Sequence, residues 1–321
     1  MVRINRKWLA MLALSWLPAW CAAGAFPDKP VRLIVAYTPG GATDVIARVL
    51  AAQLTKKWNQ QVVVENKAGA GGMIGADQVV QAAPDGYTLL LAYTPEVSIN
   101  KLIYKQMRYD PLKDLQPIAR VAQAPLVLVS GPKLPVRSYQ ELLDQGRGRQ
   151  VSFGSPGTGG QQHLAGELLK LRSGMNLLHI PYRGTSAAVA DLVGGQIDIF
   201  FATAPAIIGH IRSGKLHPLL VAGPTREGIL PDTPTAAQVG LDDFEISNWF
   251  GLFGPAGMDP ALVSRMSDDV AQILQQADTA KSLTDQGLTV AYRDPAQFST
   301  FIDAEMKKYA AIIKATGVPQ Q

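Results

Sequence analysis

The chain has little cysteine, little histidine and little charge. Its 321 residues include one cysteine and four histidines, and charged residues make up 17%, against roughly 25% in an ordinary globular protein. The cysteine, Cys21, lies within the first 25 residues, and no two histidines have the i,i+4 spacing of a helical metal site. Beyond residue 25 the sequence therefore predicts no disulfide, no catalytic thiol, no metal centre and no cofactor.

An excess of positive charge is also missing from most of the chain. The formal charge is +4, but Arg3, Arg6 and Lys7 lie in the first 25 residues, which contain no acid. The remainder has 27 lysine and arginine residues against 26 acids. This balance argues against nucleic-acid binding, which needs a basic surface. Hydrophobic residues make up 47% of the chain, which is enough for two packed lobes.

No apolar run near the N-terminus is long enough to span a membrane. The run Trp8–Trp20 has 13 residues and is interrupted by Pro18, whereas a membrane-spanning helix needs about 20. It follows the basic segment Met1–Lys7 and precedes Ala23-Gly24-Ala25, a pattern typical of a secretory signal peptide. We expect residues 1–25 to be removed near Ala25, which leaves an exported, periplasmic protein. A retained anchor and a lipoprotein at Cys21 are weaker alternatives.

Short apolar runs alternate with helical patterns along the rest of the chain. Val31–Ala36 is followed by a glycine loop and then by apolar residues at helical spacing, and the same order recurs from Val151–Phe153. Such repeats predict parallel βα units in an α/β fold. Near the C-terminus, Asp259-Pro260 and Asp294-Pro295 predict two helix starts, each with an acidic N-cap before proline.

Two apolar segments are interpreted as crossings between two lobes, Leu126–Ser130 and Trp249–Gly254. They place the first lobe at residues 26–127 and 249–321, and the second at residues 128–248. Two lobes joined by two crossings predict a ligand cleft between them and a hinge at the crossings.

Glycine-rich loops precede four of the expected helices. Unpaired amides at a helix N-terminus, with glycine allowing close approach, bind anions without lysine or arginine. The carboxyl ends of parallel strands are where a small ligand is expected. Alternatively, each loop is only a turn. The four loops are Pro39-Gly40-Gly41, Gly69–Gly72, Gly157–Gly160 and Gly184-Thr185.

Aromatic residues at strand ends or crossings are candidates for shape contacts with such a ligand. Amide donors alone are marginal for micromolar binding, because each charge-assisted hydrogen bond contributes roughly 1.5–3 kcal/mol before ordering costs. Each aromatic residue has an alternative place in the core. The candidates are Tyr37, Tyr93, Tyr182, Phe201 and Trp249.

Several longer motifs resemble the tripartite tricarboxylate transporter substrate-binding proteins, also called Bug proteins. The resemblance runs from about Phe26 to the C-terminus. It implies a type II periplasmic binding protein, or Venus flytrap, that closes on a small carboxylate and delivers it to membrane transporter subunits. The motifs are Tyr37–Asp44 (YTPGGATD), Val62–Gly72 (VVVENKAGAGG), Ala83–Leu90 (APDGYTLL), Tyr109–Asp114 (YDPLKD), His163–Leu168 (HLAGEL) and Leu192–Asp198 (LVGGQID).

The resemblance also implies where a carboxylate is held, by a loop of the first lobe and two loops of the second. A dicarboxylate, a tricarboxylate, an aromatic carboxylate and an acidic amino acid all fit, and we expect a monomer. Asp44 is alternatively a first-turn acid of its own helix. With the aromatic candidates, the expected ligand-binding residues are Tyr37, Gly41, Ala42, Thr43, Asp44, Tyr93, Thr94, Gly157, Thr158, Gly159, Tyr182, Gly184, Thr185, Ala187, Phe201 and Trp249.

The chain departs from the family pattern at three places. Ala202 replaces an acid that many members have, which puts ligand contacts there in doubt. Phe200-Phe201 adds bulk beside it and favours a flat or apolar ligand body. Glu96 is an acid where a small or apolar residue is expected, and we expect its side chain to point to solvent rather than into the cleft.

Enzyme motifs are incomplete. Gly209–Lys215 has the P-loop spacing, but Leu216 stands where magnesium needs serine or threonine. Gly69-x-Gly71 lacks the third glycine of a dinucleotide site, because Ile74 occupies that position. Gly184–Ala188 approaches a nucleophile elbow, so an esterase-like hydrolase using Ser186 with His210 or His217 stays open as the alternative. His163 is expected on a helix surface.

Overall fold

The structure is a computed structural model that describes residues 26–223 and 225–321. The predicted signal peptide lies outside the described residues. Within them, no helix combines the length and the apolar character needed to cross a membrane.

The first lobe, as we call it, is a six-stranded sheet with the helices packed on it. Its strands β1, β2 and β3 are parallel, whereas β10 and β11 run antiparallel to their neighbours. In the order in which they lie side by side, the strands are β11 (Thr289–Arg293), β4 (Leu115–Pro125), β10 (Ser247–Pro255), β3 (Thr88–Tyr93), β1 (Val31–Val35) and β2 (Val62–Asn66). The helices are α1 (Ala42–Trp58), α2 (Met73–Val80), α3 (Asn100–Ile103), α4 (Pro111–Asp114), α9 (Pro260–Gln275), α10 (Ala277–Thr284) and α11 (Pro295–Thr316), with short turns η1 (Ala70–Gly72) and η2 (Pro95–Ile99).

Helices cover both faces of this sheet, which explains the continuous apolar runs in its central strands. Leu33 of β1 lies in one cluster with residues of α1 and α9. The next residue, Ile34, lies in a second cluster with residues of α2 and α11. Both are fully buried. The predicted starts of α9 and α11 are confirmed, since Asp259 and Asp294 each accept a hydrogen bond from an amide of the first helical turn.

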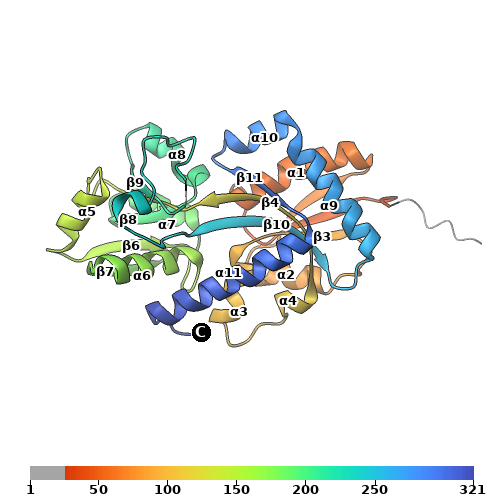
Figure 1. Cartoon of the computed structure of the whole chain (residues 1–321), viewed down its shortest axis with the longest axis horizontal. Helices are drawn as coiled ribbons and strands as arrows, with labels where there is room; N and C mark the ends of the chain where they lie inside the picture. The colour runs from red at the N-terminus through yellow and green to blue at the C-terminus, as the bar shows by residue number, and fades with distance from the viewer. Residues whose placement is uncertain (1–25, 224) are drawn as a thin grey trace, which may run out of the picture.

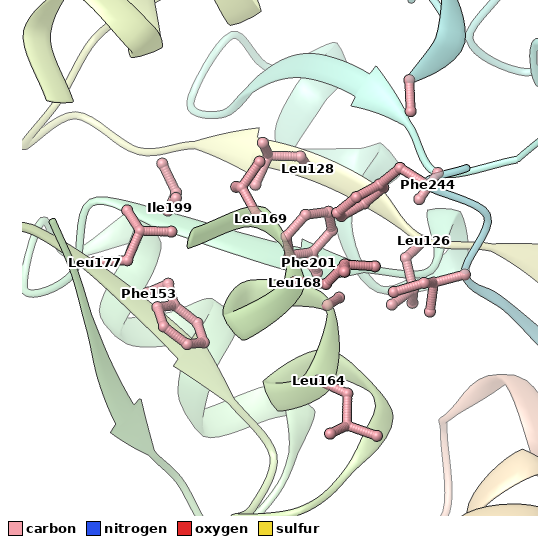
Figure 2. Packing of buried hydrophobic residues seen from close by; sticks show 14 of the residues in the cluster. Leu126, Leu128, Phe153, Leu164, Leu168, Leu169, Leu177, Ile199, Phe201 and Phe244 are labelled. Atoms are coloured by element: carbon pink, nitrogen blue, oxygen red, sulfur yellow. The ribbon is translucent and has the colours of Figure 1, made fainter. Parts of the chain in front are cut away.

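The second lobe is a five-stranded sheet with α5 (Tyr139–Gly146), α6 (Gln161–Ser173), α7 (Thr185–Val193) and α8 (Ala204–Arg212). Leucines of α6 pack against the side of the sheet that carries Phe153 and Phe201, as Figure 2 shows. Phe200 lies on the opposite side, with α7 and α8. The strand order is β7 (Leu177–Pro181), β6 (Val151–Ser155), β8 (Ile199–Ala202), β5 (Val127–Ser130) and β9 (His217–Val221), with the 3-10 turn η3 (Ala237–Val239) later in the chain.

The chain passes between the sheets twice, at neighbouring points. Strand β4 ends at Pro125 and β5 begins at Val127, so Leu126 alone joins them. The return passage lies beside it, because the Leu126 amide donates to the carbonyl of Ile246, just before β10. Strands β4 and β10 then run antiparallel into the first sheet (Figure 1). The predicted crossing segments mostly form strand, as β5 and as part of β10.

Helix α11 is shared by the two lobes. Phe298 and Ile302, in its first half, lie in the core of the first sheet. Tyr309 and Ile312, in its second half, belong to the core of the second sheet. Figure 1 shows the helix running from the first lobe towards α6 of the second, with the C-terminus beyond it.

Candidate functional site

The four glycine-rich loops all end at the start of a helix. Gly41, Gly72, Gly160 and Gly184 are the N-cap residues of α1, α2, α6 and α7, and none of these helices has a side-chain cap. In α1, α6 and α7 the first amide to bond back along the helix belongs to the fourth residue after the cap. The preceding amides are the unpaired donors of a helix start. They are those of residues 42–44, 161–163 and 185–187.

These helix starts lie at the carboxyl ends of parallel strands, and at one of them the two lobes touch. The loop Gly157–Gly160 follows β6, and α3 follows β3 through the turn Pro95–Ile99. A Cβ atom on Gly159 would lie 2.6 Å from Cγ2 of Ile103, the last residue of α3. The second-lobe loop therefore touches the first lobe beside the carboxyl end of β3.

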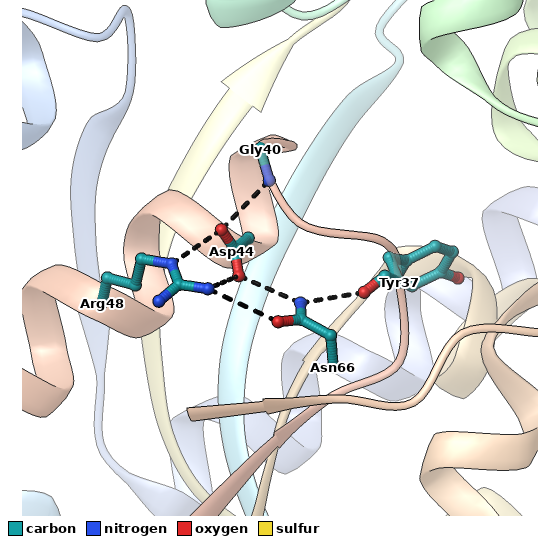
Figure 3. A network of polar contacts seen from close by, with 5 residues as sticks. All are labelled: Tyr37, Gly40, Asp44, Arg48 and Asn66. Atoms are coloured by element: carbon teal, nitrogen blue, oxygen red, sulfur yellow. Dashed lines mark hydrogen bonds and ion pairs between the residues drawn. The ribbon is translucent and has the colours of Figure 1, made fainter. Parts of the chain in front are cut away.

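In the first lobe, Asp44 organises the loop that precedes α1. Its carboxylate accepts hydrogen bonds from the amide of Gly40 at 3.0 Å, from Asn66 at 3.0 Å and from Arg48 at 2.9 Å (Figure 3). Asn66 also donates to the carbonyl of Tyr37 at 2.9 Å. Burial raises the pKa of Asp44, but these hydrogen bonds and the charge of Arg48 outweigh it, and the net pKa is lowered. Asp44 thus links both ends of the loop, and Gly41 and Ala42 stay accessible.

Replacing Asp44 with asparagine is expected to destabilise the protein by about 1–3 kcal/mol at pH 7, because an amide NH₂ would then face the donors Gly40 N–H and Arg48. A lowered folded-state pKa contributes stability that is lost as the pH falls through it, so the difference should shrink below about pH 4. Urea unfolding at pH 7 and pH 3 measures this. The matched control is Asp303→Asn, at an exposed position of α11. A deficit that stays constant across this pH range would contradict the expectation.

The remaining first-lobe candidates separate into residues at the loop and residues in the interior. Tyr37 and Tyr93 are half-buried, with ring centroids 4.7 Å apart, and the Tyr37 hydroxyl donates to the carbonyl of Gly71 at 3.1 Å. Thr94 and Trp249 are buried, and Thr94 Oγ1 accepts from the Trp249 amide at 3.1 Å. The Trp249 ring packs edge-on against Phe298, at a centroid distance of 5.4 Å. The structure brings Tyr37 and Tyr93 together at the loop and places Thr94 and Trp249 in the interior. Thr43 is buried as well, at the start of α1.

The expectation for Glu96 is wrong. Its side chain is fully buried, and neither carboxyl oxygen has a hydrogen-bond partner. A Cβ on Gly72 would lie 2.5 Å from Glu96 Cγ and 2.6 Å from the Tyr37 hydroxyl, so these two groups converge on Gly72. Burial raises the pKa of Glu96 to about 8. The residue belongs to the π-helical turn Pro95–Ile99, in which all five residues are buried. Such a turn has no marked sequence periodicity, so the inward direction was not predictable.

In the second lobe, side chains beneath the loop Gly157–Gly160 hold it in place. The amide of Gly159 donates to Nδ1 of His163 at 3.0 Å, and Oγ of Ser155 donates to the carbonyl of Gly157 at 2.8 Å. Gly159 has a φ of +78°, which favours glycine. Thr158, at the tip, is exposed, and Gly157 is half-buried. His163 is only 6% exposed, so its expected place on a helix surface is wrong. Its burial comes from packing against β6 and β7, which the local pattern of the helix does not contain.

The other second-lobe loop presents its backbone more openly. Gly184 has a φ of +136°, and nothing lies within 4 Å of a Cβ built on it. Thr185 is half-buried, and Ala187 is exposed. Tyr182 donates to Asp191 at 2.9 Å. Burial and this acid raise the pKa of Tyr182 to about 12.

Phe201 is placed in the second-lobe core. It is fully buried and stacks on Phe244 at a centroid distance of 5.8 Å. Phe200 and Ala202, on the other face of β8, are also fully buried. The bulk of these rings therefore fills two cores, and it does not line the exposed loops.

The hydrolase alternative receives no support from the geometry. Ser186 is exposed at the second position of α7, and no hydrogen bond of the described residues joins it to a histidine. Ser155 does lie 2.6 Å from Nε2 of His179, but Ser155 is fully buried, so a substrate cannot reach it. The stretch Gly209–Lys215 forms the end of α8, with Gly214 at a φ of +71° after it.

A protein family, a sequence relative and two solved structures are similar to this chain. The family described as "Tripartite tricarboxylate transporter family receptor" matches residues 46–318. Protein BugT of Bordetella pertussis is 37% identical over 309 residues, covering 95% of each chain. An R. palustris protein solved with adipate has a TM-score of 0.88 and 29% identity, over 92% of this chain and all of that one. MatC from Rhodopseudomonas palustris, solved with malate, has a TM-score of 0.81 and 28% identity, over 90% and 100%. These structures confirm the predicted two-lobed α/β fold.

Proposed function

Because this chain belongs to the tripartite tricarboxylate transporter receptor family, we propose that the ligand it carries is a small dicarboxylate held by the glycine-capped helix starts of both lobes. The chain is a periplasmic solute-binding receptor for a carboxylate. Adipate and malate, bound in two related structures, are both dicarboxylates. Among the ligand classes compatible with the sequence, they favour this one.

The observation that carries the proposal is the set of helix starts without side-chain caps. A serine, threonine or aspartate at an N-cap normally satisfies an amide of the first turn, whereas α1, α6 and α7 have glycine there. An anion can take the place of the missing cap, and the positive end of the helix dipole favours it. Two or three amides from each lobe would supply enough charge-assisted hydrogen bonds for micromolar binding, with contacts from Tyr37 and Tyr93 added.

The proposed binding surface consists of three loops, Tyr37–Thr43, Gly157–Gly160 and Tyr182–Ala187. Asp44 and His163 support these loops from below through the amides of Gly40 and Gly159. Phe201, Thr94 and Trp249 are buried, and in this proposal they support the loops without touching the ligand.

Closure of the lobes is proposed to pivot where the two crossings lie together. The bond between Leu126 and Ile246 ties the crossings. The lobes of this proposal are residues 26–127 with 249–321 and residues 128–248, and the strands change sheets within two residues of these boundaries. We infer that a monomer in this closed form delivers its ligand to the membrane subunits of the transporter. Removal of residues 1–25 near Ala25 is the proposed route of export, on the pattern of the sequence.

Isothermal titration calorimetry with adipate and malate tests the ligand class. Saturable heat is expected with at least one diacid and none with its dimethyl ester, because an ester cannot present a carboxylate to the amides. Saturable heat with the dimethyl ester would refute the proposal, and so would the absence of saturable heat with both adipate and malate. No catalytic activity is expected, so the protein should leave the ester unhydrolysed.

The Gly184→Ala variant tests the site, with an expected loss of about tenfold or more in affinity. Nothing blocks the added methyl group, so the effect comes from the backbone, since a φ of +136° is strained by roughly 1–3 kcal/mol in any residue with a Cβ. The matched control is Gly209→Ala, inside α8 and equally free of contacts. There alanine favours the helix, and affinity should not change. Equal affinity of the two variants would place the ligand elsewhere.

A further inference from the structure

Two histidine rings lie stacked beneath the second-lobe loop Gly157–Gly160. His163 belongs to the first turn of α6 and His179 to β7, and their ring centroids are 3.8 Å apart, with an angle of 19° between the planes. Phe153 of β6 continues the stack at 5.0 Å from His179. His163 is buried and His179 is half-buried. The function proposed above makes no use of either imidazole as a titrating group.

The hydrogen bonds define the protonation state of His163. Its Nδ1 accepts the amide proton of Gly159 at 3.0 Å, so Nδ1 carries no proton and the ring is neutral with its proton on Nε2. That Nε2 faces Oε1 of Glu167, one turn along α6, at 3.7 Å. A proton added at Nδ1 would point at the Gly159 N–H, and two donors cannot share this position.

His179 is tied to the same loop through Ser155. The Ser155 hydroxyl donates to the carbonyl of Gly157 at 2.8 Å, and it lies 2.6 Å from Nε2 of His179. Since serine has a single hydroxyl proton, His179 must donate to it, which puts the proton of that ring on Nε2. One histidine thus holds Gly159 and the other, through Ser155, holds Gly157.

The surroundings keep both rings neutral. Burial lowers the pKa of His163 to about 4. Burial is also the main cause that lowers the pKa of His179 to about 4, and repulsion from a charged His163 adds to it. Glu167 is the acid that faces the pair from α6, and burial raises its pKa. The groups that face the pair from β6 and from the loop, namely Phe153, Ser155 and the backbone of Gly159, do not titrate in this range.

We propose that the stacked pair is a proton-controlled support for the ligand loop, in which His163 holds Gly159 at neutral pH and releases it when Nδ1 takes up a proton. This inference rests on the proposed function, which places the loop at the ligand. Release would also reach the first lobe, because Gly159 packs against Ile103. The expected consequence is a receptor that gives up its carboxylate in acid beyond what protonation of the ligand itself explains.

Asparagine and glutamine at position 163 separate support from titration. Asn Oδ1 occupies the place of His Nδ1 and accepts from Gly159 but cannot be protonated in this range, whereas glutamine puts its amide one bond further out. With adipate and malate as probes, His163→Asn should rescue binding to within about threefold of wild type at pH 7, and His163→Gln should weaken it about tenfold. At pH 3 the wild type should lose about tenfold more affinity than His163→Asn, because only about a tenth of the His163 rings, with a pKa of about 4, stay neutral there. His217→Asn, on β9, is the control and should follow the wild type.

Comparing variants at one pH cancels the protonation of the probe. Identical pH profiles of wild type and His163→Asn would overturn the inference, as would full binding by His163→Gln. If neither adipate nor malate binds, that failure counts against the proposed function alone. The role of His163 is then tested by an NMR titration of the ligand-free protein. The Gly159 amide resonance should shift with the His163 ring as both titrate in acid, with the neutral ring protonated on Nε2. The inference is refuted if the Gly159 amide resonance does not shift as His163 titrates. It is also refuted if the neutral His163 ring carries its proton on Nδ1.

Discussion

Replacing Glu96 with glutamine is expected to make the protein more resistant to unfolding at pH 7 than at pH 4, when each is compared with the wild type. The difference in unfolding free energy between Glu96→Gln and wild type should rise by about 3 kcal/mol from pH 4 to pH 7. Glu96 is fully buried, and both carboxyl oxygens lack a hydrogen-bond partner. Ionisation there forfeits hydration, and the nearby Tyr37 hydroxyl and the backbone amides of Tyr93 and Glu96 offset only part of this loss. The folded protein therefore keeps the carboxyl protonated, with a pKa of about 8.

The direction of the pH dependence follows from this raised pKa. The unfolded chain ionises Glu96 near pH 4.5, and the folded chain ionises it only near pH 8. Between these values unfolding releases a proton, so wild-type stability falls by about 1.4 kcal/mol per pH unit on account of this residue. Below pH 4.5 the contribution is complete, and above pH 8 the loss levels off. The glutamine variant lacks this term.

Guanidinium unfolding at four pH values between 4 and 9 measures the effect as the difference between the two proteins. Other titrating groups are common to both and cancel in the difference. Glu245→Gln, at an exposed position, is the control and should run parallel to wild type. Parallel curves for Glu96→Gln as well would mean that Glu96 ionises in the folded protein near its ordinary pKa.

Phe201→Ala is expected to destabilise the protein by about 3–5 kcal/mol, the range for removing a buried phenylalanine ring. Phe201 is fully buried and stacks on Phe244, among the leucines of α6 (Figure 2). Leu171→Ala, on the exposed side of the same helix, is the control and should change stability by no more than about 0.5 kcal/mol. Thermal unfolding compares them.

The milder Phe201→Leu variant decides whether this residue also reaches the ligand. It should fold with a smaller loss, and its affinity for a dicarboxylate should equal that of the wild type, because a core ring touches no ligand. A changed affinity in a fully folded Phe201→Leu protein would return Phe201 to the binding surface.

Local signals in the sequence were sufficient for the fold and for the loops. Glycine-rich loops before helical patterns predicted the starts of α1, α6 and α7, and Asp-Pro pairs predicted those of α9 and α11. These features depend on backbone conformation within a few residues, so they can be recognised without tertiary structure. The two apolar crossings predicted two lobes, and the family motifs added the type II periplasmic binding protein fold.

The supporting side chains required tertiary structure. His163 and His179 are 16 positions apart and meet only because β6 and β7 pair while α6 folds back over them. Glu96 is polar in sequence, and its burial depends on Tyr37, Gly72 and Tyr93, which come from three separate segments. Phe201 and Trp249 lie at strand ends, where a ring can face a ligand or a core with equal ease, and only packing separates these outcomes.

Helix α11 has a consequence for how this receptor is assembled. Tyr309 and Ile312 come from the last part of the chain, yet they complete the interior built by residues 126–246, and Tyr309 accepts a hydrogen bond from Gln161. During synthesis that interior therefore stays unfinished until the final helix emerges. We therefore expect residues 126–246 to reach their full stability only after the C-terminal helix has packed onto them.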